Sequence, residues 1–272
     1  MAQAFTAHPC QVDGQLMCKG LPCGEGTDRY KGVCDKDGCD FNPYRAGVKD
    51  FYGPNKTVDS TKPMTVVTQF ITSDGTDTGD LSEIRRIFVQ DGKVFQNPKS
   101  NIQGIDTQHD SITDDMCDSF KDIMGDTNDF KKKGGLKQMG KAMDNGMVLV
   151  MSIWDDHAAN MLWLDSTYPT DKTTIGGPRG DCAITSGKPS DVESQHPDAG
   201  VKFSNIKVGD LNTTYTPGPG PTPPGPTPPS PCPGGSLTAC IGLCPSTPAV
   251  AFKACVGVCV SRCSSGEVET FL

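Results

Sequence analysis

A proline-rich run near the end of the chain divides the sequence into two folding units. Residues 217–231 read Pro-Gly-Pro-Gly-Pro-Thr-Pro-Pro-Gly-Pro-Thr-Pro-Pro-Ser-Pro. Proline fixes φ and has no amide donor, so neither a helix nor a central strand can continue through this stretch. We therefore predict an extended, semi-rigid linker over residues 213–231. It separates a first unit, residues 1–212, from a small C-terminal module, residues 232–272.

The chain has thirteen cysteines, seven before the linker and six after it. This number is typical of proteins that fold in an oxidising compartment, so we expect a secreted, extracellular protein held by disulfides. Sequons at Asn55 and Asn212 agree with that route and are candidate glycosylation sites. The first residues lack the basic start and apolar core of a signal peptide. We expect the signal peptide to be missing from this chain.

Charge and cysteine spacing exclude several partners. The net charge is -8 and the isoelectric point about 5.0, so no basic surplus is present to neutralise a nucleic acid. No apolar run reaches the length of a membrane helix. Zinc binding by His8 and the early cysteines is an alternative to disulfides, but none of the spacings is Cys-x-x-Cys. We expect a monomer without metal or cofactor that acts on a neutral substrate.

The first unit has the composition and pattern of an all-β fold. Strand-like segments, β-branched or alternating, occupy residues 64–71, 85–90, 93–96, 147–154 and 201–208. Asp91 and Gly92 predict a type I′ turn and hence a hairpin over residues 84–96. Only residues 115–124 and 136–143 have the pattern of short helices. We predict a β-sandwich with long loops.

The C-terminal module contains six cysteines in a regular arrangement. Cys240 and Cys244, then Cys255 and Cys259, are each four residues apart, which places each pair on one face of a helix. We predict a small, disulfide-rich helical hairpin. Its connectivity and its ligand stay open.

A series of motifs runs in order through the first unit. The longest are residues 38–45 (Gly-Cys-Asp-Phe-Asn-Pro-Tyr-Arg), 65–70 (Thr-Val-Val-Thr-Gln-Phe), 146–156 (Gly-Met-Val-Leu-Val-Met-Ser-Ile-Trp-Asp-Asp) and 160–169 (Asn-Met-Leu-Trp-Leu-Asp-Ser-Thr-Tyr-Pro). Together they resemble glycoside hydrolase family 7, the cellobiohydrolases and related endoglucanases. The resemblance covers the C-terminal part of the catalytic domain. It implies a concanavalin-like jelly-roll β-sandwich.

The resemblance also implies an activity. Family members are cellulases that hydrolyse β-1,4-glucosidic bonds with retention, using a Glu nucleophile and a Glu acid/base held about 5 Å apart. Those residues belong to a Glu-x-Asp-x-x-Glu strand, which we expect upstream of Met1. Asp155 and Asp156 cannot replace it, because neighbours on a strand point to opposite faces. We expect an exoglucanase that releases cellobiose from cellulose and cello-oligosaccharides. The alternatives are an endo-β-1,4-glucanase of the same family and a catalytically inactive polysaccharide-binding protein.

Carried over position by position, the resemblance implies a set of sugar-binding residues. Trp163 would be the platform on the product side of the cleavage point, Trp154 would lie next to it, and Asp155 would accept hydrogen bonds from sugar hydroxyls. His8 would bind substrate and tune the acid/base. Phe41 replaces a family tryptophan near the product. The residues around the leaving cellobiose would be Arg29, Asp37, Asp40, Arg45, Tyr168 and Arg179. The rival interpretation is that the charged residues only pair with one another and that the aromatic rings and His8 pack in the core.

The family pattern finally implies the disulfides of the first unit. It pairs Cys10 with Cys34, Cys18 with Cys23, and Cys39 with Cys117. Cys182 is left unpaired, because its family partner lies in the N-terminal half of the domain.

Overall fold

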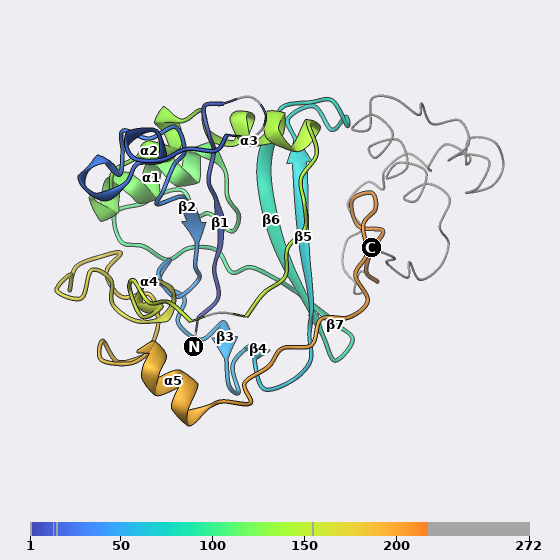
Figure 1. The fold of residues 1–272 in the computed structure, drawn as a ribbon. Helices are drawn as coiled ribbons and strands as arrows, with labels where there is room; N and C mark the ends of the chain where they lie inside the picture. The colour runs from blue at the N-terminus through green and yellow to red at the C-terminus, as the bar shows by residue number, and fades with distance from the viewer. Residues whose placement is uncertain (1, 13, 15, 154, 217–272) are drawn as a thin grey trace. The chain divides into compact units, whose positions relative to one another are not determined.

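A computed structural model describes residues 2–12, 14, 16–153 and 155–216 (Figure 1). Most of the proline-rich linker, the six-cysteine module and Trp154 lie outside the described residues, so the predictions made for them stay predictions. The chain divides into two units, Met1–Ala199 and Gly200–Leu272, which are described separately. The architecture below is that of the first unit.

The main sheet of the first unit has three antiparallel strands in the order β5–β6–β7. They are β5 (Thr65–Thr72), β6 (Leu81–Gln90) and β7 (Lys93–Gln96). The turn between β6 and β7 has positive φ at both central residues, 52° at Asp91 and 70° at Gly92, as a type I′ turn requires. The predicted hairpin is therefore confirmed.

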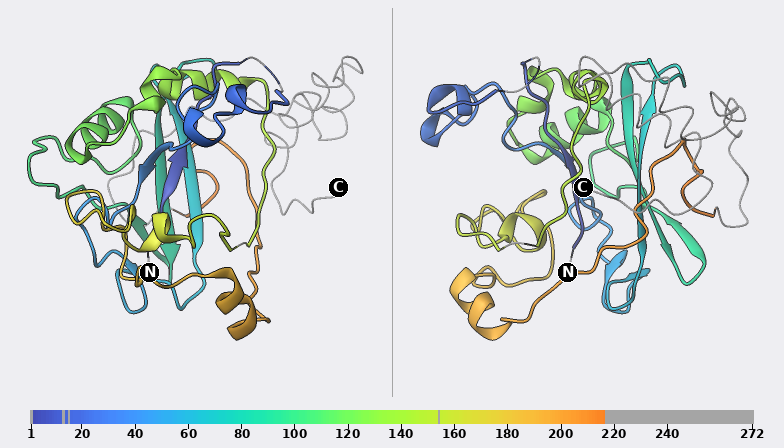
Figure 2. Two further views of the ribbon diagram at one scale, coloured as in Figure 1. Left: turned by 60° about the vertical axis from the view of Figure 1, so that its left-hand side comes forward. Right: turned by 45° about the vertical axis from the view of Figure 1, so that its right-hand side comes forward.

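Two small sheets lie beside the three-stranded sheet. Strand β1 (Phe5–Ala7) pairs antiparallel with β2 (Cys39–Phe41), and β3 (Tyr52–Gly53) pairs parallel with β4 (Val58–Asp59). In the right-hand view of Figure 2, β1 and β2 lie to one side of the long strands β5 and β6. The principal core fills the space between these layers and the first helices, and contains Phe5, Phe41, Ile84, Ile112, Met116, Phe120, Phe130 and Leu136.

The helices are more numerous than predicted. Helices α1 (Asp114–Met124) and α3 (Gly135–Asp144) confirm the two that the periodicity indicated. Five shorter elements were not predicted. They are the helices α2 (Asp129–Lys132), α4 (Leu162–Asp165) and α5 (Pro189–Gln195), and the 3₁₀ turns Leu21–Cys23 and Gly26–Asp28. Elements of one or two turns are too short to show a helical period.

Two predicted strands were wrong. Residues 147–153 and, in the second unit, residues 201–208 form no β-ladder with any described segment. A strand is completed by hydrogen bonds from a neighbour, so a strand-like sequence alone does not make one. The first segment leaves apolar side chains in solvent, including Val148 at 87% and Val150 at 76% exposure.

Candidate functional site

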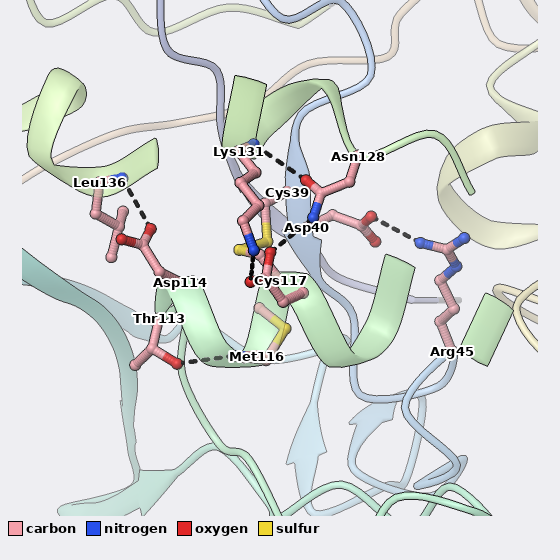
Figure 3. The surroundings of a disulfide bond; sticks show 11 residues. Cys39, Asp40, Arg45, Thr113, Asp114, Met116, Cys117, Asn128, Lys131 and Leu136 are labelled. Atoms are coloured by element: carbon pink, nitrogen blue, oxygen red, sulfur yellow. Dashed lines mark hydrogen bonds and ion pairs between the residues drawn. A yellow bond between two sulfur atoms is a disulfide. The ribbon is translucent and has the colours of Figure 1, made fainter. Parts of the chain in front are cut away.

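A disulfide fixes the strand that carries the first charged residue of the site. Cys39 on β2 is bonded to Cys117 on α1, and both residues are buried (Figure 3). Helix α1 is held at its start by Thr113, whose hydroxyl accepts a hydrogen bond from the amide of Met116. Asp40, which follows Cys39 on β2, is thereby set at a fixed distance from the helix layer.

Arg45 lies at the centre of a buried ionic network. Its Nη1 donates to Asp40 Oδ1 at 2.8 Å, its Nη2 to Asp126 Oδ2 at 2.5 Å, and its Nε to the carbonyl oxygen of Gly176 at 3.0 Å. Burial alone would raise the pKa of both carboxyls, but the charge of Arg45 holds both pKa values below their ordinary range. Lys172 Nζ supports Asp126 at 3.0 Å. The Arg45 side chain is only 4% exposed.

A second ionic group is open to solvent. Arg29 Nε donates to Asp37 Oδ1 at 2.6 Å, and the Tyr30 hydroxyl donates to Asp37 Oδ2 at 2.8 Å. The Arg29 side chain is 50% exposed. Its guanidinium therefore keeps N–H groups for a ligand while Asp37 holds its orientation.

Arg179 and Tyr168 connect these two groups. Arg179 Nη1 lies 3.7 Å from Asp40 Oδ2, and its buried Nε meets no acceptor among the described residues. Burial lowers the pKa of Arg179, although the negative charges of Asp40 and the more distant Asp37 act to raise it. Tyr168 is 37% exposed and lies near enough to Arg29 to influence its pKa. All six residues predicted around a leaving product thus fall in one region.

Trp163 on α4 is held by a carboxylate. Its indole Nε1 donates to Asp156 Oδ2 at 2.9 Å, and Asp156 also accepts from the backbone amides of Ala158, Ala159 and Met161. Burial would raise the pKa of Asp156, but these hydrogen bonds lower it. The ring is half-buried, so it is anchored at its nitrogen while part of it stays accessible.

His8 is exposed, not in the core, and one side of its ring is fixed. Its Nδ1 lies 2.9 Å from the carbonyl oxygen of Asp35. A carbonyl only accepts, so Nδ1 is the donor in this hydrogen bond, and Nε2 is the ring nitrogen left for a ligand. Gly38 packs directly on this ring, and a Cβ at Gly38 would come within 2.6 Å of His8 Cε1.

Phe41 is not a ligand contact. It is 0% exposed and packs between the rings of Phe5 and Phe120, with centroids 5.9 Å and 6.3 Å away. Its expected place near the product stays a prediction. On the short strand β2 its side chain alternates with that of Asp40, so Phe41 points into the core.

The structure contains the three disulfides that the family pattern implies, Cys10–Cys34, Cys18–Cys23 and Cys39–Cys117. Cys182 is a free thiol whose Sγ donates to Asp165 Oδ2 at 3.3 Å. Burial, together with that carboxylate, raises the pKa of the Cys182 thiol. Of the two sequon asparagines, Asn55 is exposed and Asn212 is half-buried.

One group of three side chains has the ligand types and the close spacing of a metal site. Within the described ranges, Asp155, His157 and Glu193 present ligand atoms within 4.8 Å of one another. His157 Nε2 lies 3.6 Å from Asp155 Oδ1 and 3.8 Å from Glu193 Oε1. His157 and Glu193 are exposed, and exposed acidic groups are common in proteins without a metal ion.

Sequence reasoning missed four partners of the site, namely Tyr30, Asp126, Asp156 and Lys172. Asp126 lies 81 residues from Arg45, and no local spacing connects them. No helix in the described part of the chain has both the length and the apolar character to cross a membrane.

Comparison with known proteins gives consistent matches. The family model for glycosyl hydrolase family 7 matches residues 1–215. Exoglucanase GH7B of Limnoria quadripunctata is 55% identical over 213 residues, covering 78% of this chain and 47% of that protein. The structure of a GH7 family cellobiohydrolase from Daphnia pulex matches with 56% identity and a TM-score of 0.71, covering 73% of this chain and 46% of that one.

A more distant solved structure is similar over the same share of the chain. The cellobiohydrolase from Melanocarpus albomyces complexed with cellotetraose is 42% identical, with a TM-score of 0.65. The match covers 73% of this chain and 44% of that one. The chain thus spans about half the length of the relatives that it matches.

Proposed function

Because the chain belongs to glycosyl hydrolase family 7, we propose that it forms the product-binding side of a secreted cellulase. The reaction is hydrolysis of β-1,4-glucosidic bonds with retention, and the product is cellobiose. The exoglucanase and the two cellobiohydrolases are 42% to 56% identical to this chain, whereas matching endoglucanase structures are 36% to 37% identical, and this difference supports the exoglucanase over the endoglucanase alternative.

The observation that carries the proposal is the cluster of arginine guanidinium groups and carboxylates around Asp40. A sugar hydroxyl both donates and accepts, so a ring with adjacent hydroxyls is recognised by guanidinium donors placed beside carboxylate acceptors. Arg29 with Asp37, and Arg179 with Asp40, are two such pairs. Neither arginine has all its N–H groups occupied by protein acceptors in the described structure.

The members of the cluster have different roles in this proposal. Arg29, Asp37, Arg179 and Tyr168 contact the cellobiose. Arg45 is a positioning residue, because a side chain that is 4% exposed and bound to two carboxylates holds Asp40 in place and does not reach a ligand. We keep Asp40 as an acceptor through Oδ2, the oxygen that faces Arg179.

The aromatic and histidine residues complete the binding site. Trp163 provides a ring face against which the apolar face of a sugar stacks, with its nitrogen tied to Asp156. Trp154 stands beside it in the proposal on family grounds alone. Asp155 accepts from sugar hydroxyls, and His8 presents Nε2 towards the reaction centre.

The two catalytic carboxyls are not assigned to residues described above. A retaining mechanism needs them about 5 Å apart, one as nucleophile and the other as acid/base. Asp156 is an unsuitable acid because its hydrogen bonds stabilise the ionised form and lower its pKa. We propose that the pair comes from the part of the family 7 domain that this chain does not span.

Calorimetric titration of the 272-residue chain with cellobiose tests the binding role. Arg29→Ala should weaken binding by at least about tenfold, the loss of one charge-assisted hydrogen bond. Lys31→Ala is the matched control, because Lys31 is an exposed cation of the same loop that pairs with Asp28. Equal affinities for the two variants, or no binding by the unmodified chain at millimolar cellobiose, would reject the proposed site.

A further inference from the structure

Two of the residues proposed to contact the product stand at the base of one closed loop. This segment, residues 167–179, is called the product loop below. Its two ends are joined by an isolated antiparallel bridge between Thr167 and Pro178. Tyr168 follows the first of these residues and Arg179 follows the second. The backbone amides of Tyr168 and Arg179 each donate a hydrogen bond across this base, at 3.0 Å and 2.7 Å. The position of the loop therefore sets the position of both side chains.

The rest of the product loop has little regular structure of its own. Residues 169–177 contain turns and no helix or strand. The amide of Lys172 donates to the carbonyl oxygen of Pro169 at 3.0 Å, and the amide of Gly177 donates to that of Thr174 at 3.0 Å. A segment with so few internal hydrogen bonds opens easily unless another element holds it. Its place in the fold must come from its contacts.

The element that it contacts is the C-terminal end of helix α1. Gly125 follows the helix with φ at 67°, and its amide donates to the carbonyl oxygen of Asp122 at 3.0 Å. The amide of Asp126 donates to the carbonyl oxygen of Lys121 at 2.8 Å. These two bonds form a Schellman motif, which satisfies two of the last four carbonyl groups of the helix. The carbonyl group of Met124 needs a donor from elsewhere.

Lys172 in the product loop supplies that donor. Its Nζ donates to the carbonyl oxygen of Met124 at 2.7 Å and to Asp126 Oδ1 at 3.0 Å. The Lys172 side chain is 20% exposed. A cation at the C-terminus of a helix also interacts favourably with the helix dipole. One ammonium group thus joins the loop to a main-chain acceptor and a side-chain acceptor of the same helix end.

A glycine makes the second contact between the loop and this helix end. Gly176 has a φ of 83°, and a Cβ at this position would lie 2.6 Å from Met124 Cγ. Its carbonyl oxygen accepts a hydrogen bond from Arg45 Nε at 3.0 Å. Lys172 and Gly176 therefore place the loop against Met124 from two points, and only glycine fits the closer one.

The same lysine is also the first member of a chain of ion pairs that ends at Arg179. Asp126 binds Lys172 through Oδ1 and Arg45 through Oδ2. Arg45 binds Asp40 Oδ1, as Figure 3 shows, and Asp40 Oδ2 lies 3.7 Å from Arg179 Nη1. Burial would raise the pKa of Asp126, but Arg45 and Lys172 lower it. Lys172 thus acts on Arg179 through the loop backbone and through these charges.

We propose that Lys172 is a positioning residue of the product site. It fastens the product loop to the end of α1 and thereby fixes Tyr168 and Arg179 beside the leaving cellobiose, without touching the sugar itself. The affinity for the product is then set in part by a contact made behind the site. The effect on affinity rests on the proposed function, whereas the fastening of the loop rests on the contacts alone.

Lys56 offers a matched control for this lysine. Its Nζ donates to the carbonyl oxygen of Lys49 at 2.7 Å and to Asp181 Oδ2 at 3.1 Å, and its side chain is 23% exposed. Lys172→Met and Lys56→Met therefore remove the same kinds of contact from side chains of similar exposure. Lys56 lies between β3 and β4, outside the product loop. A general loss of stability should be similar in the two variants, and a loss of positioning should occur in only one.

Calorimetric titration with cellobiose compares the variants of the 272-residue chain. Lys172→Met should weaken binding by about tenfold, because small displacements of groups that hold a sugar cost affinity steeply. Lys56→Met should leave the affinity unchanged. Lys172→Arg should restore most of the lost affinity, since a guanidinium can donate to the same two acceptors. Equal losses for the two methionine variants, or an arginine variant as weak as Lys172→Met, would overturn the positioning role.

Hydrogen exchange followed by mass spectrometry tests the fastening without a ligand. In Lys172→Met, the amides of Tyr168, Gly177 and Arg179 should exchange faster than in the unmodified chain, while those of residues 84–90 on β6 should not change. Unaltered exchange in the product loop would refute the inference. If the unmodified chain binds no cellobiose but the loop exchanges faster in the variant, the proposed function fails and the fastening stands. If cellobiose binds equally to both chains, the positioning role fails and the proposed function stands.

Discussion

Replacement of Arg45 by methionine removes the cation from the buried network and leaves two carboxylates facing each other. Asp40 and Asp126 are 14% and 21% exposed, so water cannot fully replace the guanidinium. Asp126 keeps Lys172 at 3.0 Å, and Asp40 keeps the more distant Arg179 at 3.7 Å. The variant loses two charge-assisted hydrogen bonds and one to a carbonyl.

The size of the effect follows from these contacts. All three bonds have the charged guanidinium as donor, and hydrogen bonds of a charged group contribute about 1.5–3 kcal/mol each. Breaking a buried ion pair costs about 3–5 kcal/mol in measured cases. We therefore expect Arg45→Met to lower the free energy of unfolding by about 4 kcal/mol at pH 7. The m-value should not change, because the fold is retained.

The pH dependence gives a second criterion. The pKa values of Asp40 and Asp126 are lowered in the folded chain, burial being outweighed by Arg45. Their contribution to stability is therefore present above the unfolded pKa of about 4 and is lost as the pH falls towards the folded pKa. The curves of the variant and the unmodified chain should converge as the pH falls below about 4.

Urea titrations followed by circular dichroism at several pH values measure both quantities. Arg29→Met is the matched control, because Arg29 pairs with Asp37 at the surface with its side chain 50% exposed, and such pairs contribute at most about 1 kcal/mol. A loss below about 1 kcal/mol for Arg45→Met at pH 7, or a loss that is independent of pH, would refute the reasoning.

Three further predictions concern other parts of the fold. Cys39 and Cys117 are 78 residues apart, so replacing both by serine should lower the free energy of unfolding by about 4 kcal/mol in urea titrations, and a loss under about 1 kcal/mol would show that the bond constrains little. Asp156→Ala removes the acceptor of a tryptophan indole and three amides. It should cost about 2 kcal/mol by the same assay, with the neighbouring Asp155→Ala as the control that should cost less. Burial lowers the pKa of His109 despite nearby aspartates, so stability should fall as the pH drops below about 6.5. His109→Gln should remove that part of the pH dependence, and an unaltered curve would exclude this histidine as its source.

The parts of the fold that were predicted correctly depend on local chemistry. The β6–β7 hairpin follows from Asp91-Gly92, two residue types that tolerate positive φ. Helices α1 and α3 are long enough to show an amphipathic period. Residues 147–153 have an equally clear strand pattern, but the outcome depends on a partner strand that the sequence of the segment does not contain.

The predicted roles of the candidate site residues stay predictions, and the hydrogen bonds among these residues were not predicted from the sequence. The resemblance placed Asp40 and Arg45 near a product. The structure shows that Arg45 binds Asp40 directly and also binds Asp126, a partner that neither spacing nor composition indicates. Phe41 lies in the core, and a substitution at a family position does not by itself reveal whether a side chain is buried. Its burial follows from the register of β1 against β2, which is a long-range property.

The beginning of α1 has an effect beyond that helix. Thr113 accepts from the Met116 amide, and the next residue, Asp114, accepts from the amide of Leu136 at 3.0 Å, at the start of α3 (Figure 3). Adjacent side chains thus close the first turns of two helices, so fraying of one removes an acceptor from the other. The two helix starts should open in a single cooperative event, which makes this junction one unit in any partial unfolding of the domain.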